Sequence, residues 1–205
     1  LTNNILFAQQ SKEISSFFFF FRKNNISNVE KKMKSGFNTD GMIGVVALYN
    51  AKTPKMYRAL IENGLELDGI YGALALIDAI DKGDLESVKI LIDNGADLNT
   101  RAYITDEIKK EITSLNEHYY NDYIIMHRFL DPKEGGKPDT PFTYVLRNWA
   151  WSMSGHLGNE KEKYFLDLMD LMLESKKVNF GKTIYYNERQ KYIDVLHYAI
   201  ITDPN

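Results

Sequence analysis

The chain has 205 residues, of which 44% are hydrophobic and 26% are charged, a composition typical of a folded globular protein rather than a disordered or collagen-like one. A net charge of -3 gives no general attraction for nucleic acid or anionic membrane, so we expect neither as a partner. The chain has no cysteine, which excludes disulfides, thiolate metal sites and cysteine nucleophiles.

The first residues allow two interpretations. Residues 5–8 (Ile-Leu-Phe-Ala) resemble the end of a signal peptide, with a small residue at the cleavage position. On this interpretation residues 1–12 are a signal-peptide remnant and the protein is exported, for example to a periplasm. Otherwise residues 1–12 are a helical N-terminal extension of a cytoplasmic protein. The five phenylalanines at 17–21 are far fewer than the roughly 18 apolar residues that span a bilayer, so we expect them in the core.

Residues 79–99 (AIDKGDLESVKILIDNGADLN) read as a helix end, a Gly-Asp break, an amphipathic helix and an exit turn. Asp84 is a predicted N-cap, and Gly95 is a predicted helix terminator because glycine adopts the left-handed conformation at little cost. The predicted core stripe comprises Leu85, Val88, Ile90, Leu91 and Ile92. This segment resembles an ankyrin repeat.

Two earlier segments match it. Residues 49–68 place Pro54 in the first turn of a second helix, and residues 20–38 place Asn24-Asn25 where residues 79–99 have Gly83-Asp84. The terminators Gly36, Gly64 and Gly95 are 28 and 31 residues apart, close to the ankyrin period of about 33.

Two later segments resemble the opening of an ankyrin repeat. Residues 139–146 are similar to its Thr-Pro-Leu-His motif, with Thr143 in place of the histidine, and a second helix is predicted over 162–175. A fifth opening covers residues 194–200. An insertion at 101–138 contains a predicted helix from 106 to about 130, residues 149–159 form a second insertion, and residues 183–193 read as a finger hairpin.

No residue pattern points to catalysis, a cofactor or an obligatory metal. His118 and His127 are nine residues apart, which places them on opposite faces of a helix and prevents joint metal ligation. The resemblance gives His197 a structural role in bracing the turn between repeats. No Gly-x-Ser-x-Gly elbow occurs, and residues 135–137 (Gly-Gly-Lys) lack the rest of a phosphate-binding loop.

Aromatic residues in the irregular segments are the candidate partner-binding residues, because tyrosine and tryptophan bury a large area with few rotatable bonds. With the histidine of the inserted helix, the candidates are Tyr71, Tyr103, Tyr119, Tyr120, Tyr123, His127, Trp149, Trp151, Tyr185 and Tyr186.

The sequence therefore predicts an all-α stack of helix pairs over residues 13–205, with four to five ankyrin-like units, short β-hairpin fingers and one inserted helix. The resemblance implies a non-catalytic protein that binds another protein on the concave face of fingers and first helices. Two alternatives stay open: an enzyme or small-ligand binder with a site between the 101–138 insertion and the repeats, and a regulatory segment of a longer protein.

Overall fold

The computed structural model describes residues 2–115, 139–152 and 159–179. Within these ranges the regular elements are all α-helices: α1 Thr2–Arg22, α2 Ile26–Lys34, α3 Met42–Asn50, α4 Pro54–Glu62, α5 Gly69–Asp81, α6 Leu85–Asp93, α7 Asp106–Leu115, α9 Pro141–Trp151 and α10 Asn159–Glu174. The all-α prediction is confirmed for this part of the chain. α1 runs without a break across the boundary predicted at residue 12.

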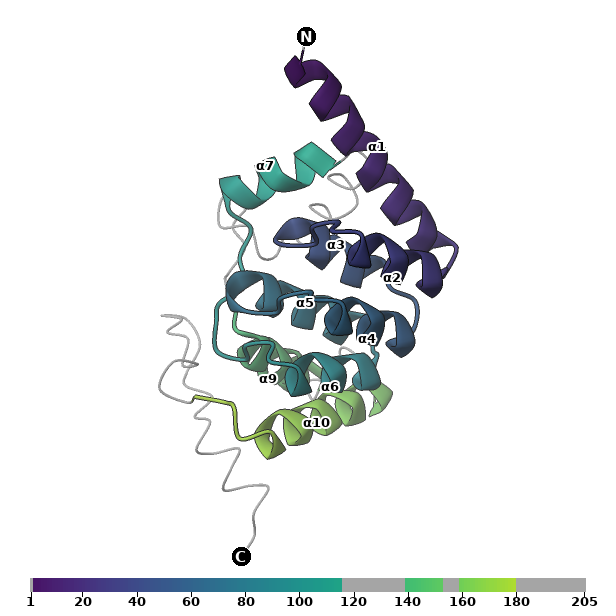
Figure 1. The fold of residues 1–205 in the computed structure, drawn as a ribbon. Coiled ribbons are helices and arrows are strands. Elements are labelled where there is room, and N and C mark those ends of the chain that lie inside the picture. The colour runs from purple at the N-terminus through teal and green to yellow at the C-terminus, as the bar shows by residue number, and fades with distance from the viewer. Residues whose placement is uncertain (1, 116–138, 153–158, 180–205) are drawn as a thin grey trace, which may run out of the picture.

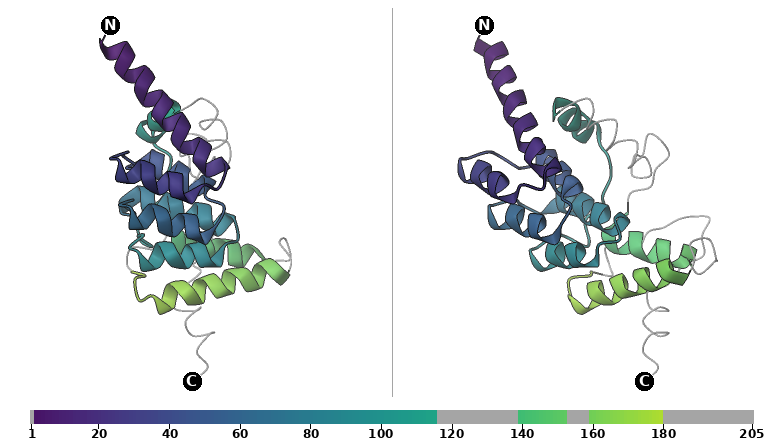
Figure 2. Two further views of the ribbon diagram at one scale, coloured as in Figure 1. Left: turned by 45° about the vertical axis from the view of Figure 1, so that its right-hand side comes forward. Right: turned by 90° about the vertical axis from the view of Figure 1, so that its right-hand side faces the viewer.

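The helices form a stack of two layers (Figures 1 and 2). In one layer α1 contacts α3, α3 contacts α5 and α5 contacts α9; in the other α2 contacts α4, α4 contacts α6 and α6 contacts α10. Each first helix is thus followed by a second helix in the adjoining layer. We call α1–α2, α3–α4, α5–α6 and α9–α10 units 1 to 4.

The second helices of units 1 to 3 begin with side-chain caps. Asp84 Oδ1 accepts a hydrogen bond from Ser87 N at 3.1 Å, which confirms the predicted N-cap. Asn25 caps α2 in the same way, and Thr53 caps α4 with Pro54 in the first turn, as predicted. These bonds satisfy amide groups that have no partner within the helix.

The predicted terminators are confirmed by the backbone. Gly36, Gly64 and Gly95 follow α2, α4 and α6 with φ of +90°, +99° and +103°. After each of them the next amide reaches back five residues, as Ala96 N does to Leu91 O at 3.0 Å. Asn24 and Gly83 end α1 and α5 in the same left-handed conformation, with φ of +50° and +73°. In the aligned pairs Asn24-Asn25 and Gly83-Asp84, the first residue therefore ends the first helix of the unit and the second residue caps the second helix.

The core lies between the two layers. In α5 every residue from Gly72 to Ile80 is buried, and all of them except Asp78 are uncharged and small or apolar, as in a helix enclosed on all sides. Within the phenylalanine run Phe17, Phe18 and Phe21 are buried, as expected, whereas Phe19 is 50% exposed. The stripe predicted for α6 is buried except for Leu85, which is 37% exposed.

The predicted β-hairpin fingers are not found in the described residues, which contain no strand. The connections at 35–41 and 63–68 are too short for paired strands once the terminator turn has been completed. An isolated antiparallel bridge joins Ala102 to Asp139, with Ala102 N donating to Asp139 O at 2.8 Å. The hairpin predicted at 183–193 lies outside the described residues.

Two predicted boundaries need correction. α9 continues through Trp151, so the second insertion begins later than Trp149, and α10 begins at Asn159 rather than at 162. The start of α9 matches the expected motif: Thr140 and Thr143 cap each other's backbone amides, with Pro141 in the first turn. α7 forms the first part of the predicted inserted helix, and residues 116–138 lie outside the described part.

Candidate partner-binding face

The inserted helix α7 packs against α3 (Figure 1). Its predicted apolar positions Ile108, Ile112 and Leu115 recur at helical spacing and are buried. Thr105 caps its start by accepting a hydrogen bond from Ile108 N at 3.1 Å. In the view from the right-hand side α7 lies beyond the layer of first helices, away from α2 and α4 (Figure 2).

Glu111 of α7 joins the inserted helix to the starts of two first helices. Its Oε2 accepts a hydrogen bond from Met42 N at 3.1 Å, and its Oε1 accepts one from the Tyr71 hydroxyl at 2.7 Å. Gly41, the residue before α3, offers no capping side chain, and a Cβ there would lie only 2.9 Å from Glu111 Oε2. Glu111 therefore replaces the missing local N-cap of α3, where a negative charge also suits the helix dipole.

This contact alters Tyr71. Burial, together with the hydrogen bond and the negative charge of Glu111, raises the pKa of Tyr71 to about 12. The hydroxyl thus stays protonated as a donor. The predicted residue Tyr71 thus lies against the inserted helix, but its hydroxyl is already hydrogen-bonded within the chain.

The other candidate residues are placed as follows. Tyr103, in the connection between α6 and α7, is 38% exposed. Trp149 is half-buried and packs against the core from α9, and Trp151 ends α9. Tyr119, Tyr120, Tyr123, His127, Tyr185 and Tyr186 lie outside the described residues, as does the side chain of Trp151.

Ionisable side chains gather at the opposite edge of the stack, where each first helix ends. Lys82 Nζ donates to Leu48 O at 3.1 Å, to Tyr49 O and to Ala51 O at the end of α3, and lies over the Tyr49 ring at 5.1 Å. Burial lowers the pKa of Lys82, whereas the negative charges of Asp78 and Asp84 oppose that shift. A cation at a helix C-terminus is favoured by the dipole, so this lysine serves as a cap.

The same arrangement recurs in the neighbouring units. Lys52 Nζ donates to Arg22 O at the end of α1 at 3.3 Å, and the Tyr164 hydroxyl donates to Ile80 O near the end of α5 at 2.8 Å. The first helices of units 1 to 3 (α1, α3 and α5) are therefore each capped at their C-terminal end by a side chain of the following unit. Sequence analysis missed these residues because each lies about thirty residues or more from its acceptor. The 30-residue spacing of Lys52 and Lys82 was the available signal.

Three tyrosines at this edge are held in the neutral form. The Tyr144 hydroxyl donates to Asp81 Oδ1 at 2.5 Å, and burial together with nearby carboxylates raises the pKa of Tyr57, Tyr144 and Tyr164. A hydroxyl with a raised pKa is a poor base and a poor nucleophile near neutral pH. The chemistry available to this cluster is hydrogen bonding between units.

Within the described residues no group of three or more His, Asp or Glu side chains is arranged to hold a metal ion. His118, His127, His156 and His197 all lie outside these residues. None of the helices in this part of the chain has the length and apolar character needed to cross a membrane.

Comparison of the chain with protein-family models, curated proteins and solved structures finds no match.

Proposed function

We propose that this chain is a divergent ankyrin-like repeat protein that binds another protein and has no catalytic role. The observation that carries the proposal is the recurring unit: helix pairs stacked in one direction, with matching terminators at Gly36, Gly64 and Gly95 and caps donated from one unit to the next. Stacked repeats of this kind present an extended surface to large ligands. In the described residues Lys52, Lys82 and Glu111 serve helix ends and the junctions between helices, which supports binding rather than catalysis.

The proposed binding face is the edge at which α3 and α5 begin, together with α7. The two hydrogen bonds of Glu111 and the buried side chains of α7 give the inserted helix one position relative to the stack. A preorganised surface loses less conformational entropy on association. Tyr103, exposed just before α7, is the described aromatic residue best placed to contact a partner.

Site-specific photo-cross-linking tests this face without disturbing the fold. We would place p-benzoylphenylalanine at Tyr103 in one variant and at the exposed Lys89 of α6 in a control variant, and irradiate both in the cells from which the protein comes. The proposal predicts a discrete adduct with one protein from position 103 and none from position 89. Equal adducts from both positions, or an adduct from position 89 alone, would reject the face formed by α7 and the starts of α3 and α5.

A further inference from the structure

Charge is distributed unevenly along the stack. Residues 1–62 contain nine lysines and arginines against four aspartates and glutamates, whereas residues 63–115 contain five against eleven. The chain as a whole has a net charge of -3, so units 1 and 2 form a basic region on an otherwise acidic molecule. Such a region creates a local positive potential that the net charge conceals.

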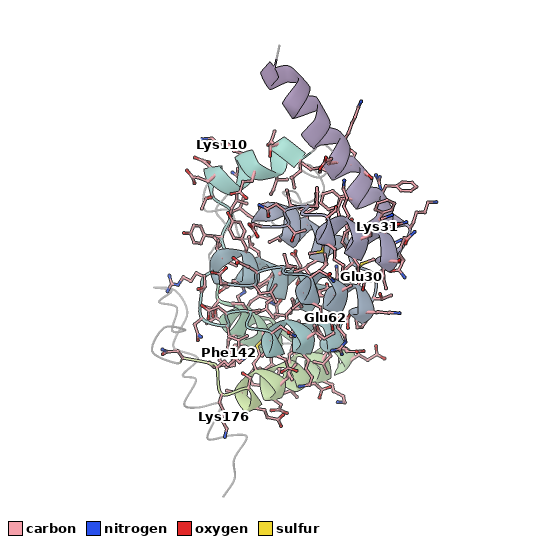
Figure 3. The ribbon with its side chains drawn as sticks, viewed as in Figure 1. Glu30, Lys31, Glu62, Lys110, Phe142 and Lys176 are labelled. Atoms are coloured by element: carbon pink, nitrogen blue, oxygen red, sulfur yellow. The ribbon has the colours of Figure 1, made fainter. Side chains whose placement is uncertain are left out.

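Five exposed cations lie on units 1 and 2, and we call them the basic patch: Arg22, Lys23, Lys31, Lys52 and Lys55. Arg22 and Lys23 end α1, and the bond from Lys52 Nζ to Arg22 O brings the connection between α3 and α4 against them. Lys55 lies in the first turn of α4, which packs on α2, the helix that carries Lys31 (Figure 3).

Glu30 precedes Lys31 on α2, but within the described residues it forms no ion pair with the basic patch. Within the described part of the chain none of the five members of the patch forms an ion pair, whereas Lys32 next to Lys31 pairs with Glu13 and Arg58 on α4 pairs with Glu86. Lys23 lies over the exposed Phe19 ring at 6.0 Å. Like charges at this density repel one another, and a bound anion would relieve that repulsion.

The patch is bounded, which restricts the ligand. At the same edge of unit 3 the chain carries Asp81 and Asp84, and Lys82 between them is engaged with the carbonyl groups that end α3. A nucleic-acid duplex extending beyond two units would meet these carboxylates, whereas a short acidic peptide segment would not. Phe19 is the one large, strongly exposed apolar side chain described in units 1 and 2, too little for the apolar face of a membrane-binding surface.

We propose that the basic patch binds an acidic segment of a partner protein, in which aspartate or glutamate side chains pair with Arg22, Lys23, Lys31 and Lys55. Arg22, Lys23 and Lys55 lie at the edge where the first helices end, opposite the starts of α3 and α5, and Lys31 lies in the last turn of α2. The proposal therefore stands or falls independently of the face formed by α7 and the starts of α3 and α5.

The test uses a fluorescein-labelled oligoglutamate peptide and measures its dissociation constant by fluorescence polarisation. One variant carries Lys23→Gln, Lys31→Gln and Lys55→Gln; the control carries Lys89→Gln, Lys161→Gln and Lys163→Gln, which are also exposed and remove the same net charge. Circular dichroism checks that both variants are folded. We expect the patch variant to bind roughly tenfold more weakly and the control to stay within about twofold of the wild type, with affinity falling as salt is raised.

Four results would overturn the proposal. They are no measurable binding of the peptide by the wild type, equal weakening in both variants, tighter binding of a DNA duplex or of phosphatidylserine vesicles than of the peptide, and loss of peptide binding because copies of the chain associate through the patch. Sedimentation equilibrium of the wild type and the patch variant identifies the last case.

Discussion

At the scale of single residues, two glycines allow the first helices to approach the preceding connections. A Cβ on Gly72 would lie 1.8 Å from the carbonyl oxygen of Leu67, and one on Gly44 would lie 2.4 Å from that of Thr39. The two glycines are 28 residues apart, and in each case the blocking carbonyl belongs to the fifth residue before. The same close contact is therefore built twice.

Gly72→Ala should lower the free energy of unfolding by about 3 kcal/mol, because the methyl group meets backbone that cannot rotate away. Gly36→Ala is the matched control: its φ of +90° strains an alanine, but nothing lies within 4 Å of its Cβ, so we expect a loss of about 1 kcal/mol. Urea unfolding measures both. Equal losses, or a stable Gly72→Ala variant, would mean that Leu67 does not lie against Gly72.

Sequence patterns predicted many single-residue roles because capping and termination are local. Asp84, Pro54 and the three terminator glycines act through neighbours within five residues, so their signals lie within one short segment. Lys176 follows α10 with a φ of +57°. This terminator was not predicted, because a left-handed conformation is expected at glycine rather than at lysine. The Glu111 cap was also missed, since its acceptor role depends on a residue 69 positions away.

At the scale of helices, the caps donated between units explain why the stack holds its register. Lys82 fixes the end of α3 from unit 3 through several carbonyls, and Lys52 fixes the end of α1 from unit 2. In a stack each unit contacts only its neighbours, so such bonds contribute to the interface term of stability.

Lys82→Met should therefore destabilise the protein by about 1 kcal/mol, since methionine keeps the apolar stem but removes the charge that caps α3. Lys89→Met is the control, because Lys89 lies on the exposed face of α6 with only an Asp93 partner, and we expect a change below about 0.5 kcal/mol. Thermal unfolding followed by circular dichroism compares the two. If the two variants melt together, Lys82 is a solvated surface lysine.

The insertion was the least predictable element. Its helical period correctly indicated that Ile108, Ile112 and Leu115 face one way, but periodicity does not say against which helix they pack. The contact with α3 depends on Glu111 meeting the amide left uncapped by Gly41. Finger hairpins were predicted from the family resemblance and are not found in the described residues, where the connections are short turns.

For the whole molecule, four tyrosines link stability to alkaline pH. Tyr57, Tyr71, Tyr144 and Tyr164 have raised pKa values in the folded state, so between pH 10 and the folded pKa the native protein holds protons that the unfolded chain releases. Their contribution is complete below pH 10 and is lost as the pH rises. Lys82 opposes this trend, since its pKa is lowered.

Stability should accordingly fall steeply above pH 10. For Tyr71, whose folded pKa is about 12, the loss falls between pH 10 and pH 12, and Tyr71→Phe should make the decline shallower in that window. Urea midpoints measured across this range provide the comparison. A wild-type midpoint that stays constant through pH 11 would contradict the assignment of these tyrosines as buried donors.

The order of the helices in the two layers was predictable, because the repeats recur along the chain. The charge and the shape of the faces of the stack were not predictable. Repeat spacing indicates which helices stack, as with Gly36, Gly64 and Gly95. Which surface then remains open depends on where α7 lies, and the position of α7 is set by contacts between residues far apart in the sequence.

The position of the inserted helix decides which face is open to a partner, and the pKa of Tyr71 reports that position directly. We would titrate the protein labelled with 13C-tyrosine by NMR, assign the Tyr71 signal with Tyr71→Phe, and repeat the titration with Glu111→Gln. If α7 lies on the starts of α3 and α5, Tyr71 titrates at about 12 in the wild type and at a clearly lower pH in Glu111→Gln, because the negative charge is gone. A wild-type value near the ordinary 10.0, or a value that Glu111→Gln leaves unchanged, would place the inserted helix elsewhere.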